Sequence, residues 1–230
     1  MYWLLLGTGV LVAYLAGSIN FAIIISTLTQ KTDIRTVGNL NPGTANIGRN
    51  LGKGWGALVF FGDVGKAVVP LVLAEDLYFH FGTFQGIAGL TIMGMAGILG
   101  HRKPIFFRFK GGAGLATTMG VMAFFGPAEL GIAMLIGAGI GMVIFRGKKF
   151  KLGRWIAMLI ILLTPVVHLV FFYIFDERVG GVIGVGGTEP ALIGAVGVLA
   201  VYIFSANIQT VIETVRGAKG SEAVDQSTDP

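Results

Sequence analysis

Two polar, glycine-rich segments contain the residues of this chain that are best suited to binding an anion. Residues 38–49 read GNLNPGTANIGR, with three asparagines and one arginine in twelve positions. Glycine and asparagine permit turns in which several backbone N–H groups point at one place, and arginine offers a planar fork for phosphate. The pattern predicts a phosphate cradle, with an ordinary turn-rich loop as the alternative. Its candidate ligands are Asn39, Asn41, Asn46 and Arg49.

The second segment, residues 100–118, reads GHRKPIFFRFKGGAGLATT and leads directly into an apolar run. A glycine-rich turn before a helix presents backbone N–H groups and the positive end of the helix dipole, which together attract anions. A lysine before the turn adds a mobile positive charge. The segment therefore predicts a second anion site, built from Lys110, Gly111, Gly112, Gly114 and Thr117.

Ionisable residues inside or beside the apolar runs are further candidates. Asp63 and Lys66 are three positions apart, so they lie on one helix face and can pair, either as a functional site or as a structural ion pair. His101 could donate a hydrogen bond or act as a base at the mouth of the protein, or it could be an inert loop histidine. His168 is expected to hydrogen-bond a neighbouring helix.

The elements that position these residues are predicted to be membrane helices. Apolar side chains make up 54% of the 230 residues and charged ones only 13%, and the mean hydropathy is +0.79. A soluble domain has about 25% charged residues, so this composition excludes a soluble enzyme, a disordered chain and a coiled coil. The absence of cysteine excludes disulfides, thiolate metal sites and a cysteine nucleophile. We expect no metal and no cofactor.

Seven apolar runs predict an all-α protein with seven transmembrane helices, of which the fourth is short. Merging the fourth and fifth runs into one helix bent at Pro127 would give six. With seven helices, 15 of the 17 basic residues fall on one side of the membrane, whereas six would divide them. The positive-inside rule therefore predicts an N-terminus outside and a C-terminus in the cytoplasm. The runs are residues 2–28, 55–74, 84–100, 114–126, 130–145, 155–175 and 191–206.

The domain organisation is expected to be simple. Residues 1–220 form a single polytopic membrane domain, and residues 221–230 form a polar disordered tail. The expected surroundings are the lipid bilayer and phosphorylated small molecules, with no nucleic acid.

The motifs Gly17-Ser18, GNLNPGTANIGR, FFGDVGKA at residues 60–67 and GHRKPIFFRFKGGAGLAT follow one another along the chain. In this order they resemble the bacterial acyl-phosphate:glycerol-3-phosphate acyltransferase family. The resemblance implies a seven-span protein of the bacterial inner membrane that transfers a fatty acyl group from acyl phosphate to the 1-hydroxyl of glycerol 3-phosphate, the first step of phospholipid synthesis. Because the donor is a mixed anhydride, no protein nucleophile is required, and catalysis would come from positioning and charge stabilisation.

The chain departs from the family pattern in the GNLNPGTANIGR motif, in the glycine loop, near the C-terminus and at Lys151. Lys151 stands where the family has a serine and could restore the charge that is missing at Ala113, while Asn207 is a retained candidate ligand. These departures leave a second hypothesis open, namely a non-catalytic homologue or a transporter that binds a phosphorylated small molecule. The replaced positions are Asn39 for serine, Leu40 for glycine, Thr44 for alanine, Ala113 for lysine, and Phe204, Ser205 and Ala206 for His-Arg-Glu.

Overall fold

The computed structural model describes residues 1–80, 82–144, 152–174 and 190–226, and all regular secondary structure in these ranges is helical. The 3-10 turns are η1 (Ile34–Thr36) and η2 (Ile105–Phe107). The α-helices are α1 (Tyr2–Gly17), α2 (Phe21–Gln30), α3 (Thr44–Asn50), α4 (Lys53–Leu77), α5 (Phe84–Arg102), α6 (Leu115–Phe125), α7 (Pro127–Ile144), α8 (Leu152–Ile174) and α10 (Pro190–Gln226).

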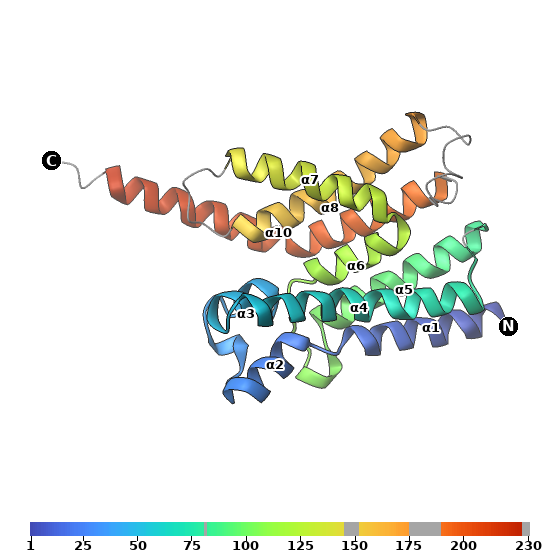
Figure 1. The fold of residues 1–230 in the computed structure, drawn as a ribbon, viewed down its shortest axis with the longest axis horizontal. Coiled ribbons are helices and arrows are strands. Elements are labelled where there is room, and N and C mark those ends of the chain that lie inside the picture. Colours follow the sequence, from blue (N-terminus) through green and yellow to red (C-terminus); the bar gives the residue numbers. More distant parts are fainter. Residues whose placement is uncertain (81, 145–151, 175–189, 227–230) are drawn as a thin grey trace.

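Two groups of helices lie on either side of α6 (Figure 1). Helices α1, α4 and α5 pack against one another, α8 contacts both α7 and α10, and α6 contacts members of both groups. One apolar core runs through all of them. The outer faces carry exposed large apolar side chains, such as Phe61, Leu135 and Val201, each more than two-thirds exposed. Such surfaces suit lipid rather than water.

Four segments of the described residues are long and apolar enough to cross a bilayer: Tyr2–Gln30, Lys53–Leu77, Phe84–Phe107 and Pro190–Ile208. The shorter apolar helices are Leu115–Phe125, Pro127–Val143 and Trp155–Phe171. The 11 residues of α6 extend over about 16 Å at 1.5 Å per residue, roughly half of a hydrocarbon core. The predicted short helix is therefore present, and its ends must be buried by other helices.

The first apolar run is not one continuous helix, as the sequence predicts, but two helices. Asn20 has an extended backbone, and its side-chain Oδ1 accepts a hydrogen bond from the backbone N–H of Ile23 at 3.1 Å, which caps the start of α2. An asparagine at this position favours a new helix start over continuation. Gly17, at the end of α1, packs so closely on the backbone of Gly97 that a Cβ would collide with it. The break directs α2 towards η1 and α3 (Figure 1).

The C-terminal helix α10 extends beyond its apolar segment to Gln226. Residues 221–226, which the sequence places in a polar tail, therefore belong to this helix, and residues 227–230 lie outside the described residues. The boundary at residue 220 stays a prediction.

Candidate active site

The segment of residues 38–49 is organised around the buried side chain of Asn46. Its Oδ1 accepts hydrogen bonds from the backbone N–H of Asn39 at 3.2 Å and from Nδ2 of Asn50 at 3.0 Å. Its Nδ2 donates to the carbonyl oxygens of Ile34 at 3.2 Å and Val37 at 2.9 Å. An amide side chain offers two donors and two acceptor sites, so Asn46 is fully used within the protein. It shapes the loop that precedes α3 instead of facing a ligand.

The other candidates of this segment lie nearer to its surface. Oδ1 of Asn39 accepts a hydrogen bond from the backbone N–H of Asn41 at 3.2 Å, which closes a tight turn. Asn39 is exposed, Asn41 is half-buried, and Arg49 is exposed in the last turn of α3. No hydrogen bond or ion pair to another described residue engages the guanidinium of Arg49.

The glycine loop, residues 110–114 before α6, has two backbone N–H groups that form hydrogen bonds within the protein. The N–H groups of Gly111 and Gly112 donate to the carbonyl oxygens of Arg102 and His101, both at 3.2 Å. These two amides are therefore not free for an anion, in contrast to the sequence-based expectation. The hydrogen bonds fold the loop back on the end of α5.

Helix α6 begins immediately after Gly114, which adopts a left-handed backbone with φ of +84°. No side chain caps this helix start. Its first-turn N–H groups thus retain the partial positive charge of a helix N-terminus. Thr117 is fully buried in this turn, and its Oγ1 has no hydrogen-bond partner among the residues that the structure describes.

The two predicted loops meet in the folded protein. A Cβ on Gly112 would lie 2.7 Å from the carbonyl oxygen of Pro42, so only glycine allows this approach. Arg35 strengthens the contact, because its Nη1 donates to the carbonyl oxygens of Phe107 at 3.1 Å and Lys110 at 3.0 Å. Lys110 itself has an exposed side chain.

Arg35 is held in place by Asp33 through an ion pair of 2.6 Å. The hydrogen bond from Arg35 lowers the pKa of Asp33, and the same bond raises the pKa of Arg35. Sequence reasoning did not select Arg35 as a site residue. It stands outside the recognised motifs, and its bridging role depends on residues more than 70 positions away.

A third segment, near residue 207, joins the glycine loop through Ala113. The carbonyl oxygen of Ala113 accepts hydrogen bonds from Nη1 of Arg102 at 2.9 Å and from Nδ2 of Asn207 at 3.2 Å. Nη2 of Arg102 also donates to the carbonyl oxygen of Ala206 at 2.7 Å. The predicted candidate Asn207 thus lies at the loop, while Arg102 is a second arginine that the sequence-based selection missed. Lys151 lies outside the described residues.

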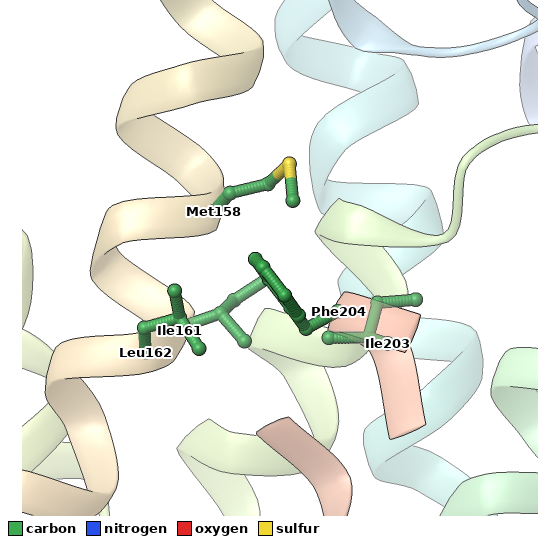
Figure 2. Close-up of a pocket in the computed structure, with 5 residues that line it drawn as sticks. All are labelled: Met158, Ile161, Leu162, Ile203 and Phe204. Carbon is green, nitrogen blue, oxygen red and sulfur yellow. The ribbon is translucent and has the colours of Figure 1, made fainter. Parts of the chain in front are cut away.

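A shallow apolar hollow lies between α8 and α10, with a volume of about 150 Å³ that includes space open to the surroundings (Figure 2). It adjoins the glycine loop, because a Cβ on Gly114 would lie 3.2 Å from Cδ1 of Ile203. The side chains that line it are Met158, Ile161 and Leu162 from α8 and Ile203 and Phe204 from α10.

Asp63, Lys66 and His101 form a buried cluster behind the glycine loop. Lys66 Nζ lies 2.7 Å from Oδ1 of Asp63 and 2.8 Å from Nδ1 of His101. Lys66 Nζ also donates to the carbonyl oxygen of Ile19 at 2.7 Å, where the chain breaks between α1 and α2. The spacing of Asp63 and Lys66 predicted their pairing, but His101 is only 3% exposed and is not a loop residue. It belongs to the last turn of α5.

A second buried acid lies apart from these loops. Glu129 occupies the first turn of α7 and is fully buried. Its Oε1 lies 3.7 Å from Nδ1 of His168. Neither side chain has a hydrogen-bond partner within the described part of the chain, so the expected hydrogen bond of His168 to a neighbouring helix is not formed.

The residues described hold no group of three or more His, Cys, Asp or Glu side chains that could bind a metal ion. The chemistry available at the meeting loops is therefore that of cations, amides and helix ends. Such a site binds and orients anions.

Comparisons with known proteins agree with this chemistry. A family model described as glycerol-3-phosphate acyltransferase matches residues 8–214. The glycerol-3-phosphate acyltransferase of Mycoplasma mobile is 39% identical over 171 residues, which are 72% of this chain and 65% of the relative. That of Aquifex aeolicus is 42% identical over 131 residues, 57% of this chain and 65% of the relative. The chain thus spans 65% of the length of these two curated relatives.

Two solved structures share the fold. Both are crystal structures of PlsY (YgiH), an integral membrane glycerol 3-phosphate acyltransferase, and each match covers 92% of this chain and 92% of that one. The glycerol 3-phosphate form has a TM-score of 0.65 at 30% identity, and the lysophosphatidic acid form has a TM-score of 0.63 at 28% identity. This chain belongs to the glycerol-3-phosphate acyltransferase family.

Proposed function

We propose that this protein transfers a fatty acyl group from acyl phosphate to the 1-hydroxyl of glycerol 3-phosphate, giving 1-acylglycerol 3-phosphate and inorganic phosphate. The observation that carries the proposal is the contact between Gly112 and Pro42, which brings the loop of residues 38–49 against the glycine loop before α6. A reaction between two phosphorylated substrates needs two such loops side by side. The mixed anhydride is already activated, so holding the hydroxyl against the acyl carbon accomplishes most of the catalysis.

The phosphate groups would be held by the polar groups that the fold leaves available. Arg49 and Lys110 supply exposed cations, and the uncapped start of α6 supplies backbone N–H groups. Asn39 and Asn41 lie at the rim of the same loop. Lys151 would add a further cation, in place of the one absent at Ala113.

The acyl chain would begin in the hollow between α8 and α10 (Figure 2). Because its volume of about 150 Å³ includes space open to the surroundings, the hollow is a shallow depression, and only a short piece of the chain would lie against it. The rest would lie in the bilayer. Because Ile203 lines the hollow and also contacts the glycine loop, the reacting end of the acyl chain would reach the phosphate site.

In the bilayer, we propose seven crossings in the bacterial inner membrane, with the N-terminus outside. The four long apolar segments and the three shorter apolar helices together supply seven. The basic residues of both loops then face the cytoplasm, where soluble phosphorylated substrates are found. Fusion reporters at the two ends of the chain test this arrangement, and reporters on the same side of the membrane would contradict it.

The full chain, purified in detergent or in vesicles and supplied with labelled glycerol 3-phosphate, tests the reaction. Product is expected with acyl phosphate and not with acyl-CoA. Binding of glycerol 3-phosphate without product would instead indicate a non-catalytic homologue. Uptake of label into sealed vesicles without product would indicate a transporter.

A further inference from the structure

The buried ammonium of Lys66 determines which ring nitrogen of His101 carries the hydrogen. Lys66 Nζ contacts three acceptors: Oδ1 of Asp63 at 2.7 Å, the carbonyl oxygen of Ile19 at 2.7 Å and Nδ1 of His101 at 2.8 Å. An ammonium has three donors and no acceptor. All three N–H groups are therefore engaged, and Nδ1 of His101 must be the acceptor of one of them.

The competing arrangement, a charged His101 that donates from Nδ1 to Asp63, fits the distances less well. Nδ1 of His101 lies 3.5 Å from Oδ1 of Asp63, beyond the usual range of an N–H···O hydrogen bond. A hydrogen on Nδ1 would also point at the ammonium, which lies closer. A neutral imidazole has one N–H and one acceptor nitrogen, so acceptance at Nδ1 leaves the hydrogen on Nε2.

Nε2 of His101 faces the place where the two anion loops meet. A Cβ on Gly112 would collide with Nε2 on one side and with the carbonyl oxygen of Pro42 on the other. Within the described residues, Nε2 has no hydrogen-bond partner. A donor without an acceptor in the protein is available to a ligand oxygen, and this one lies beside the position where the substrates would lie.

We propose that His101 is a catalytic hydrogen-bond donor, whose Nε2–H binds an oxygen of the acyl phosphate, and that Lys66 and Asp63 are positioning residues that fix its tautomer. The proposal rests on the proposed acyl transfer. In that step, the hydroxyl oxygen bonds to the acyl carbon, the bond from this carbon to the phosphate oxygen breaks, and the hydroxyl proton leaves with the phosphate. With its hydrogen on Nε2, His101 is not the base. It stabilises negative charge on oxygen.

Three variants distinguish a donor from a base. In His101→Gln the side-chain amide places an N–H near the position of Nε2. In His101→Asn the shorter amide reaches only the position of Nδ1, next to Lys66. We expect His101→Gln to keep kcat/KM within about tenfold of wild type, and His101→Asn to lose about 10²–10³-fold, as for other oxyanion donors. Equal losses in both variants would overturn the proposal. Lys66→Met should add an ionisation to the acid side of the rate profile, because Nδ1 can then be protonated. An unchanged profile would contradict the role of Lys66.

The kinetic constants of His101→Asn also identify the oxygen. A fall in kcat assigns the hydrogen bond to the carbonyl oxygen, where charge develops in the transition state, and a higher KM for acyl phosphate alone assigns it to the phosphate. Unchanged constants would refute both.

A measurement independent of activity separates this inference from the proposed function. The chain has three histidines, so ¹⁵N-histidine NMR of the purified full chain, with His101→Gln to assign the signal, reports the tautomer directly. A hydrogen on Nε2 between pH 6 and 8 is expected. A hydrogen on Nδ1 would refute the inference even in an active enzyme, whereas an inactive protein with the hydrogen on Nε2 would refute only the proposed function.

Discussion

Replacing Arg35 with methionine removes a side chain that connects the segment before residues 38–49 with the glycine loop. Nη1 of Arg35 donates to the carbonyl oxygens of Phe107 and Lys110 at 3.1 and 3.0 Å. Hydrogen bonds from a charged donor contribute about 1.5–3 kcal/mol each when protected from water. The side chain is 26% exposed, so we expect about 1.5–3 kcal/mol for the two together. If the loops must stay in register for reaction, kcat/KM falls about ten- to a hundredfold.

The assay is acyl-phosphate-dependent formation of 1-acylglycerol 3-phosphate by the purified full chain. Lys31→Gln is the matched control, because it removes the same charge from an exposed position at the end of α2. Arg35→Lys keeps the charge but loses the planar fork, so its loss should be intermediate. If Arg35→Met and Lys31→Gln have the same kcat/KM, the bridge does not hold the loops for catalysis and the reasoning fails.

Three further predictions concern the cations, the helix packing and the loop ion pair. Arg49→Ala and Lys110→Ala should each reduce kcat/KM at least tenfold, since each removes a charged phosphate contact of about 1.5–3 kcal/mol. Wild-type kinetics in both variants would show that the phosphate site lies elsewhere. Gly120→Ala should lower the free energy of unfolding in detergent by about 1–3 kcal/mol, because a Cβ would lie 2.7 Å from a backbone oxygen of α4. Gly131→Ala is the control and should be nearly neutral, because the space around its Cβ is open. The hydrogen bond from Arg35 lowers the pKa of Asp33. The stability that this carboxylate contributes is therefore present above the ordinary carboxyl pKa of about 3.9 and is lost as the pH falls through the lowered value. The melting temperatures of wild type and Asp33→Asn should converge in acid, and a constant difference would contradict this.

Much of the membrane character could be predicted from the sequence, as could the two polar segments that meet in the folded protein. Hydropathy is a sum over neighbouring residues, so the apolar runs and the short helix α6 are evident before any folding is considered. The pairing of Asp63 and Lys66 follows from their spacing on one helix. The segments 38–49 and 110–114 stand out because they are rich in glycine, asparagine and basic residues and lie between apolar runs. Such residues between membrane helices indicate a turn or a binding site.

Other features were decided by the tertiary structure alone. The N–H groups of Gly111 and Gly112 turn inward, and His101 is buried against Lys66. Arg35 meets a carbonyl oxygen 75 positions further along the chain. Local spacing constrains only residues within a turn or two of one another, because a helix repeats every 3.6 residues. The partner of each buried donor is chosen only when helices distant in sequence pack and exclude water, so that every polar group must find an acceptor inside the protein.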